Sequence, residues 1–419
     1  MKTYKNLYEK IISEDNLRKA FFEASKGKRN RKDVKEVLEN IDFHVKKLHD
    51  ILKAEEFIPA HHTPHEINDG FKMKKRHIIK PFYRYEQVVH HAIIQVLAPT
   101  EDQIRKDPTL HKVINRGAYE FTCGSVKGRG AHYGKRYIER WIRQDRKNTK
   151  YVLKIDVRHF FESIPHDKLK NMLRRVIADE KTLRLLDIII DAVPNGLPLG
   201  YYTSQWLANF YLQGLDHYIK QEVWLDMKQR KEEQFRKRMA RKGVSSYDMP
   251  KYLCGAKYCV RYMDDIVIFG ANKRELKTML ERIEAYCKDR LGLVIKENKQ
   301  IFPLSKEVEM QLIGKDGERK TTVKEFGRAL DFMGFLFRRT RTTLRKSITF
   351  RITRKARKLG KKEKVNWYDA AAMISRMGYI KHTDTYDMYV ERVKPYIDVK
   401  KLKRKIAAHA KKGAKQNAA

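Results

Sequence analysis

The sequence has few of the features that mark secreted, disulfide-stabilised or membrane proteins. Its 419 residues include only four cysteines, Cys123, Cys254, Cys259 and Cys287. Their spacing has no zinc-like pairing, which favours buried or idle thiols. No run of 18 apolar residues occurs, so the sequence predicts no membrane-spanning helix. The first residues also lack the apolar core of a signal peptide. These absences are typical of a protein of the reducing cytoplasm.

Acidic residues are scarce relative to basic ones. The chain has 52 Asp and Glu against 92 Lys and Arg, which gives a formal net charge of +40. This excess is far larger than solubility requires and predicts a polyanionic partner. Nucleic acid is the leading candidate, because each neutralised phosphate releases counterions and strengthens binding. An anionic membrane surface is the competing partner.

Two adjacent carboxylates form the most informative motif, Tyr262-Met263-Asp264-Asp265. Apolar, β-favouring residues flank it on both sides, so the pattern predicts a β-hairpin with the acids at its tip. Neighbouring carboxylates repel each other unless a cation neutralises them. Mg²⁺ suits this position, since it binds a few carboxylates and leaves other positions to water and phosphates. The alternative for the dipeptide by itself is a solvated turn.

A third acid, Asp156, ends an apolar segment over 151–156 that predicts a strand. The end of a strand holds a metal ligand rigidly. Together with Asp264 and Asp265, this acid could hold two Mg²⁺ ions, or Mn²⁺ in their place. Such a pair would activate a primer 3′-hydroxyl and stabilise in-line phosphoryl transfer. The alternative for Asp156 alone is a residue at the entry to a helix.

A glycine-rich segment over 196–209 lies between these acids. Gly200 would allow the backbone to approach a ligand closely, and Ser204 would cap a helix that begins near it. In isolation this segment is more typical of an ordinary loop and helix start than of a ligand site.

The order of these motifs resembles the palm of a reverse transcriptase. Asp156 is followed after five residues by Phe161, then by Gly-x-Pro-x-Gly-x-x-x-Ser and by Tyr-x-Asp-Asp. Further segments resemble two fingers motifs, the next palm motif and the primer-grip hairpin, in that order: 76–81, 127–132, 291–299 and 332–335. The resemblance covers roughly residues 60 to 340, and the helical remainder fits a thumb.

The resemblance implies an α+β fold of the right-hand polymerase type, with fingers, a palm built on an antiparallel sheet, and a helical thumb. Helical spacing predicts helices over much of 1–60, over 88–97 and 169–193, and in an amphipathic segment from Leu276 to Cys287. We expect these domains: an N-terminal helical extension 1–60, fingers 61–150, palm 151–340 with a basic insertion 228–242, thumb 341–405, and a disordered basic tail 406–419.

The family also implies roles for matching residues. Asp156 and Asp264 would be the main catalytic metal ligands and Asp265 the third acid. Phe161 would be the aromatic gate that excludes a ribose 2′-hydroxyl and so favours dNTPs. Lys299 is a candidate proton donor to pyrophosphate, with Lys296 as its competitor. The full set of expected dNTP-binding residues is Phe161, Arg76, Lys127, Arg129, Gly200, Ser204, Gln205 and Lys299. The expected primer grip is Phe332, Met333, Gly334 and Phe335.

Two residues of the glycine-rich segment point to a sub-family. Most bacterial relatives have Gln before the second Gly and Pro after the Ser, whereas this chain has Leu199 and Gln205. The result resembles the signature of diversity-generating retroelement reverse transcriptases. That resemblance implies error-prone copying of a dedicated template RNA, with mistakes at template adenines. The partners would be the template RNA, the RNA/DNA hybrid, dNTPs and a small basic accessory protein, with no membrane, in a bacterial or phage-encoded setting.

Other assignments remain open from the sequence. A retron-type or antiphage-defence reverse transcriptase is the first alternative, and a splicing maturase or non-catalytic RNA-binding protein is the second. The basic segment 228–242 has eight Lys or Arg and two Glu. It would contact RNA or an accessory protein, or form a solvated basic helix.

Overall fold

The structure is a computed structural model, and it divides the chain into two compact units. It describes residues 3–60, 62–69, 74–249, 256–313 and 319–416. Unit 1 comprises Met1–Gly134 and Leu153–Ile301, and unit 2 comprises Lys135–Val152 and Phe302–Ala419. Both contain helices and antiparallel strand pairs, which confirms the predicted α+β class.

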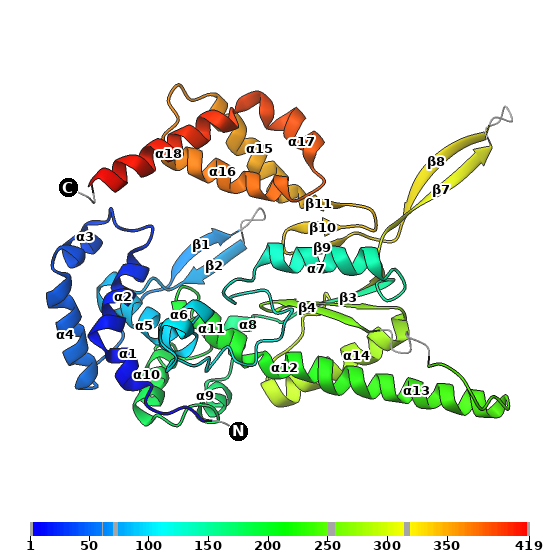
Figure 1. The fold of residues 1–419 in the computed structure, drawn as a ribbon, viewed down its shortest axis with the longest axis horizontal. Helices are drawn as coiled ribbons and strands as arrows, with labels where there is room; N and C mark the ends of the chain where they lie inside the picture. Colours follow the sequence, from blue (N-terminus) through cyan, green and yellow to red (C-terminus); the bar gives the residue numbers. More distant parts are fainter. Residues whose placement is uncertain (1–2, 61, 70–73, 250–255, 314–318, 417–419) are drawn as a thin grey trace. The chain divides into compact units, whose positions relative to one another are not determined.

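Unit 1 begins with the helices that the apolar spacing predicts. They are α1 (Tyr8–Ile12), α2 (Glu14–Ser25), α3 (Lys32–Glu39) and α4 (Ile41–Lys53). The helix expected over 88–97 is α5 (Val88–Leu97), and it packs against α2 (Figure 1). Eight of its ten residues are buried, because it is apolar on nearly every face.

A four-stranded sheet carries Asp156 and the Tyr-Met-Asp-Asp motif. Its strands are β3 (Tyr151–Asp156), β4 (Tyr258–Tyr262), β5 (Asp265–Gly270) and β6 (Gln300–Pro303), in the order β4-β5-β3-β6. β4 and β5 are antiparallel. The amphipathic helix predicted around Leu276 is α14 (Lys273–Tyr286), which packs against β5 through its buried apolar face. β5 is an interior strand between β4 and β3, and Ile266 to Phe269 are fully buried.

The remaining elements of unit 1 connect this sheet to the N-terminal helices. They are β1 (His65–Asp69), β2 (Lys74–Ile78), η1 (Tyr83–Gln87), α6 (Glu101–Lys106), α8 (Phe160–Ser163), α9 (His166–Arg174), α10 (Glu180–Ile190), α11 (Tyr202–Tyr211), α12 (Gln213–His217), η2 (Tyr218–Val223), α13 (Trp224–Arg241) and η3 (Cys287–Leu291). The basic segment 228–242 lies almost wholly in α13, a long helix whose outer half carries exposed Arg and Lys.

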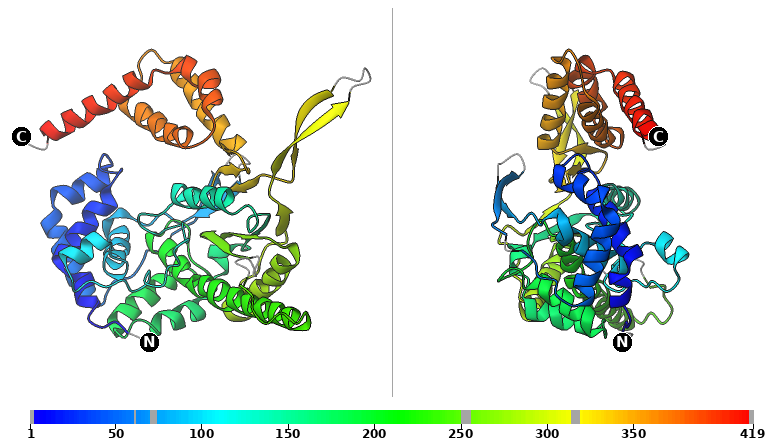
Figure 2. Two further views of the ribbon diagram at one scale, coloured as in Figure 1. Left: turned by 45° about the vertical axis from the view of Figure 1, so that its right-hand side comes forward. Right: turned by 90° about the vertical axis from the view of Figure 1, so that its left-hand side faces the viewer.

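Unit 2 contains a two-stranded ribbon, a small three-stranded sheet and the helices that follow them. Its elements are most of α7 (Ala131–Gln144), β7 (Lys306–Ile313), β8 (Arg319–Phe326), β9 (Leu330–Phe332), β10 (Phe335–Phe337), β11 (Thr342–Leu344), α15 (Lys346–Gly360), α16 (Trp367–Lys381), α17 (Tyr386–Arg392), η4 (Lys394–Tyr396) and α18 (Val399–Gln416). Figure 2 shows β7 and β8 as a long two-stranded ribbon. The small sheet has the strand order β11-β10-β9. The side chains of Phe332, Phe335 and Phe337 are fully buried and form the centre of the small sheet.

Three expectations from the sequence need correction. The tail expected to be disordered is helical as far as Gln416, because α18 is rich in Ala and Lys, which favour helices. Ser204 does not cap its helix, since α11 begins at Tyr202 and Ser204 lies buried within its first turn. The single helical stretch expected over 169–193 is two helices, α9 and α10.

The expectations for thiols and membrane spans can be compared with the structure directly. Cys123, Cys259 and Cys287 are free and buried, as expected, and Cys254 lies outside the described residues. Within the described ranges, no helix is both long and apolar enough to cross a bilayer.

Candidate active site

The Tyr-Met-Asp-Asp motif forms the tight hairpin that its flanking residues predict. Tyr262 pairs with Asp265, so Met263 and Asp264 are the two residues of the turn. Met263 has a φ of 56°, in the left-handed region where glycine is usually found. The turn therefore presents Asp264 at the edge of the sheet, and Asp265 is the first residue of β5.

Asp156 and Asp264 meet at this edge. β3 ends at Asp156 and is the hydrogen-bonded neighbour of β5. The two carboxyl groups are within hydrogen-bonding contact. Burial, together with the charge of Asp156 and its hydrogen bond to Asp264, raises the pKa of Asp264 from 3.8 to about 7. Two carboxyl groups in contact cannot both be ionised cheaply unless a cation or a shared proton lies between them.

Two lysines balance the acids. Lys296 Nζ lies 2.6 Å from Asp156 Oδ2, and Lys154 Nζ lies 3.4 Å from Asp265 Oδ2. The backbone N–H of Lys296 also donates to the carbonyl of Asp156, at 2.8 Å, which fixes this lysine beside the strand end. Lys299, the residue that the resemblance first suggests as proton donor, pairs with Glu284 instead. The geometry thus favours its competitor Lys296.

A divalent cation fits the pair Asp156 and Asp264. Asp156 Oδ1 is buried and accepts no hydrogen bond from a described donor, and the carboxyl group of Asp156 lies against that of Asp264. A cation between the two carboxyl groups would coordinate Asp156 Oδ1 and an oxygen of Asp264. Over the ranges that the structure describes, no three His, Cys, Asp or Glu side chains converge on one metal position. This is compatible with Mg²⁺, which takes one or two carboxylates and completes its shell with water and substrate phosphates.

The expected aromatic gate contacts the glycine-rich segment. Phe161 lies in α8, is half-buried, and its carbonyl accepts from the N–H of Leu197 at 2.7 Å. A Cβ on Gly196 would lie 2.4 Å from this same carbonyl. The sequence motifs around Phe161 and Gly196 therefore meet in space, as the roles expected from the resemblance would require.

The second glycine of this segment packs against the backbone that follows β2. Gly200 has a φ of 117°, and a Cβ there would lie 1.9 Å from the carbonyl oxygen of Ile79. Leu199 accepts a hydrogen bond from the N–H of Ile79 at 2.8 Å. Only glycine fits at position 200, because both its backbone angle and its surroundings exclude a side chain.

Ser204 and Gln205 have different surroundings. Ser204 is 2% exposed, and its hydroxyl has no hydrogen-bond partner among the described residues. Gln205 is exposed, and its Oε1 accepts from Ser125 Oγ at 3.1 Å. Of the two, only Gln205 is accessible to a substrate in this conformation.

The three basic residues expected to hold phosphate also differ. Arg76 on β2 and Lys127 are exposed. Arg129 uses Nη1 to donate to the carbonyls of Tyr119, at 2.6 Å, and Thr122, at 3.4 Å. Arg129 therefore stabilises its own loop, while the other two side chains reach solvent.

The primer-grip residues lie in unit 2. Phe332 pairs with Phe335 across a two-residue turn of Met333 and Gly334, whose φ angles are 51° and 89°. This is the hairpin that the resemblance implies, with a glycine at a left-handed position. Its role in holding a primer stays a prediction.

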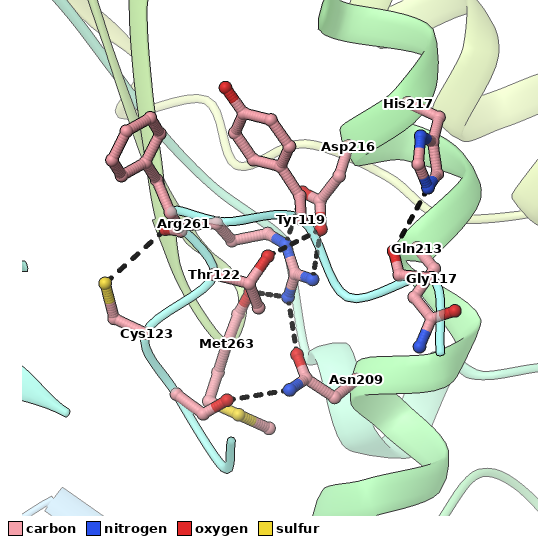
Figure 3. A network of polar contacts seen from close by, with 12 residues as sticks. Gly117, Tyr119, Thr122, Cys123, Asn209, Gln213, Asp216, His217, Arg261 and Met263 are labelled. Atoms are coloured by element: carbon pink, nitrogen blue, oxygen red, sulfur yellow. Dashed lines mark hydrogen bonds and ion pairs between the residues drawn. The ribbon is translucent and has the colours of Figure 1, made fainter. Parts of the chain in front are cut away.

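Sequence reasoning missed the buried side chains that surround the hairpin turn. Figure 3 shows Arg261 between Asp216, Asn209 and Met263. Arg261 is 1% exposed and is the largest fully buried side chain of the described residues. A signal was present, since Arg261 is the one charged residue in the apolar run that leads to Tyr262. A buried arginine needs buried partners for its charge and its donors.

Comparisons with known proteins agree with this geometry. The family model described as "Reverse transcriptase (RNA-dependent DNA polymerase)" matches residues 85–327. Among curated proteins, the chain is 26% identical over 189 residues to an uncharacterized 91 kDa protein in cob intron of Schizosaccharomyces pombe, covering 36% of this chain and 23% of that protein. It is 25% identical over 200 residues to a putative COX1/OXI3 intron 2 protein of Saccharomyces cerevisiae, covering 38% and 22%. Protein YkfC of Escherichia coli is 22% identical over 240 residues, covering 52% and 57%.

The chain thus spans less than a quarter of the two fungal relatives and little more than half of the bacterial one. Among solved structures, apo telomerase from Candida tropicalis, truncated from its C-terminal domain, is similar with a TM-score of 0.37 and 11% identity. That match covers 70% of this chain and 58% of the telomerase chain. A score this low supports no inference about function.

Proposed function

Because this chain belongs to the reverse transcriptase (RNA-dependent DNA polymerase) family, we propose that it copies an RNA template into DNA with dNTPs and divalent ions. The proposed partners are the template RNA, the growing RNA/DNA hybrid and dNTPs. The excess of 40 positive charges supports a partner of this kind, because phosphate neutralisation and counterion release strengthen binding.

One observation carries the proposal. Asp156 and Asp264 come from distant parts of the chain, yet their carboxyl groups are in contact at the ends of neighbouring structural elements. Burying two acids together is costly, and the same burial and repulsion raise the pKa of Asp264 above its usual range. A site that binds Mg²⁺ and phosphate offsets the cost, whereas a purely structural site gains nothing from it.

The chain's own residues then have defined tasks. Asp156 and Asp264 would hold Mg²⁺, with Asp265 beside them, and when bound the ions activate the 3′-hydroxyl and stabilise the transferred phosphoryl group. Lys296, whose Nζ lies 2.6 Å from Asp156 Oδ2, would give a proton to the departing pyrophosphate. Phe161 would close the sugar pocket against a 2′-hydroxyl. Gln205 would contact the nascent base pair, since its side chain is exposed at the start of α11.

Primer extension on an RNA template with Mg²⁺ tests this function. Wild type should extend the primer with dNTPs, and the double variant Asp264→Ala with Asp265→Ala should not, while it still binds the RNA/DNA hybrid. Asp226→Ala provides a matched control, because Asp226 is an acid of α13 that pairs with Arg282 away from the hairpin. If wild type binds the hybrid tightly but incorporates no dNTP, the polymerase proposal is wrong.

We further propose that the enzyme is of the diversity-generating type, with error-prone copying of a dedicated RNA. Leu199 and Gln205 support this, because an apolar residue at position 199 removes an amide that could constrain base-pair geometry. The test is the frequency of misincorporation opposite template adenine, measured by sequencing cDNA. Leu199→Gln should lower that frequency, and an unchanged frequency would contradict the proposal. A small basic accessory protein would be recovered with the enzyme if this assignment is right.

A second candidate is an intron-associated reverse transcriptase. It is favoured by the names of the two fungal relatives, both of which place those proteins in introns. Sequencing the RNA that purifies with the protein distinguishes the candidates. An intron RNA would support this candidate, a template with a near-copy repeat in a target gene would support the diversity-generating type, and a self-priming structured RNA would support a retron-type enzyme.

A further inference from the structure

We propose that Arg261 is a positioning residue that holds the Met263–Asp264 turn in the geometry needed for catalysis. The inference rests on the proposed polymerase function and adds a residue that does not touch substrate or metal. It follows from the buried polar network around the Arg261 guanidinium, shown in Figure 3.

The guanidinium reaches the turn directly. Arg261 Nη1 donates to the carbonyl oxygen of Met263 at 2.9 Å, and this carbonyl belongs to the peptide that leads into Asp264. Arg261 is itself in β4, next to Tyr262, so its side chain folds back beneath its own hairpin. The contact therefore fixes the peptide plane on which the orientation of Asp264 depends.

Asp216 fixes the guanidinium. Its Oδ1 accepts from Nε at 2.7 Å and its Oδ2 accepts from Nη2 at 2.6 Å, a two-pronged pair in which both residues are at most 2% exposed. Thr122 Oγ1 donates to Oδ2 of the same carboxylate at 2.9 Å. Because bidentate pairing sets the plane of the guanidinium, Nη1 can point only toward the turn and its neighbour Asn209.

Asn209 joins this pair to the opposite side of the turn. Its Oδ1 accepts from Arg261 Nη1 at 2.8 Å, and its Nδ2 donates to the carbonyl of Gly124 at 2.7 Å. Gly124 in turn packs against the turn, since a Cβ there would lie 2.8 Å from the backbone nitrogen of Met263. The turn is thus held on one side by a hydrogen bond and on the other by close packing.

The turn needs such support for a physical reason. Met263 adopts a left-handed φ of 56°, which is unfavourable for a residue with a side chain because Cβ comes too close to the following carbonyl oxygen. Asp264 beside it is a half-buried acid in contact with a second acid. Strain and repulsion both favour a rearranged turn, so the observed geometry requires surrounding contacts that fix it.

Arg261→Lys is the most informative variant. Lysine keeps a buried positive charge near Asp216, but it has no planar fork and cannot bond Asp216 on two atoms while also reaching Met263. Asn209→Ala is the second variant, since it removes the link to Gly124 and leaves the ion pair intact. Asp179→Ala is the stability control, because it removes the N-cap of α10 and the bonds to Leu7 and Tyr8, away from the hairpin.

Two measurements test the inference at a temperature where every variant is folded by circular dichroism. In primer extension, Arg261→Lys should lower kcat by about 100-fold with the KM for dNTP within about twofold of wild type, and Asn209→Ala should lower kcat by about tenfold. In native-state hydrogen exchange, the amides from Met263 to Asp265 should exchange faster in both variants than in wild type, and at the wild-type rate in Asp179→Ala.

The outcomes separate this inference from the proposed function. If Arg261→Lys retains wild-type kcat, or if its turn amides exchange at the wild-type rate, Arg261 is not a positioning residue even though the enzyme is a polymerase. If kcat falls equally in Asp179→Ala at matched stability, the effect is general destabilisation and the inference is wrong. If wild type does not polymerise, the proposed function fails, and the exchange rates alone decide whether Arg261 orders the turn.

Discussion

Replacing Asp264 by Asn should stabilise the metal-free protein while it abolishes synthesis. Burial and the neighbouring Asp156 raise the pKa of Asp264 from 3.8 to about 7. The folded state therefore keeps a proton on this group to a higher pH than the unfolded chain does. Ionised Asp264 opposes folding at neutral pH, and an amide of the same shape removes that opposition and can donate to Asp156.

The size of the effect follows from the shift. Stability that depends on protonated Asp264 is fully present below pH 3.8, falls as pH rises, and is lost once pH exceeds about 7. At about 1.4 kcal/mol per pH unit, the cost of ionisation is about 2 kcal/mol at pH 5 and about 4 kcal/mol above pH 7. The stabilising effect of Asp264→Asn should therefore be about 2 kcal/mol larger at pH 7.5 than at pH 5.

Thermal unfolding in EDTA at both pH values measures this difference. Asp264→Asn should unfold at a higher temperature than wild type, with the larger margin at pH 7.5, and Mg²⁺ should stabilise wild type more than the variant. Asp226→Asn is the control, because the pKa of Asp226 is shifted in the opposite direction. The hydrogen bond from Arg282 lowers that pKa, so replacing the ionised Asp226 carboxylate by an amide should not stabilise the fold. The reasoning is refuted if Asp264→Asn is no more stable than wild type at pH 7.5, or if its margin is the same at pH 5.

Further predictions concern the surroundings of the acids. Gly200→Ala should lower the free energy of unfolding by about 2 kcal/mol or more and abolish primer extension, because the new Cβ would lie 1.9 Å from the carbonyl oxygen of Ile79. Thermal unfolding measures the change in stability, and an unchanged midpoint would contradict this packing. In single-turnover primer extension, Lys296→Ala should lower the rate of nucleotide incorporation by about 100-fold, whereas Lys299→Ala should extend the primer at nearly the wild-type rate. Equal rates in the two variants would exclude Lys296 as the proton donor. Phe161→Ala should raise the ratio of NTP to dNTP incorporation by about tenfold or more, and an unaltered ratio would remove Phe161 as the sugar gate.

Local patterns in the sequence determine much of this protein by themselves. Short-range apolar spacing predicts β3 and α5 with their observed ends, because the spacing of apolar residues in a strand or a helix repeats within a few neighbouring positions. The same holds for the hairpin at Asp264, where β-favouring residues flank two acids. Charge alone indicates a polyanionic partner. The ordered motifs place the chain near reverse transcriptases, which the family match confirms.

The tertiary structure decides how distant residues combine. No local pattern could show that Asp156 touches Asp264, that Lys296 rather than Lys299 reaches the acids, or that Ser204 is buried inside α11. The network of Arg261, Asp216 and Asn209 joins a strand to two helices, so its members have no fixed spacing in the sequence. The sequence determines which ionisable and polar side chains the protein has. Their ionisation and their hydrogen-bond partners depend on burial and distance, which are set by packing between elements that are remote along the chain.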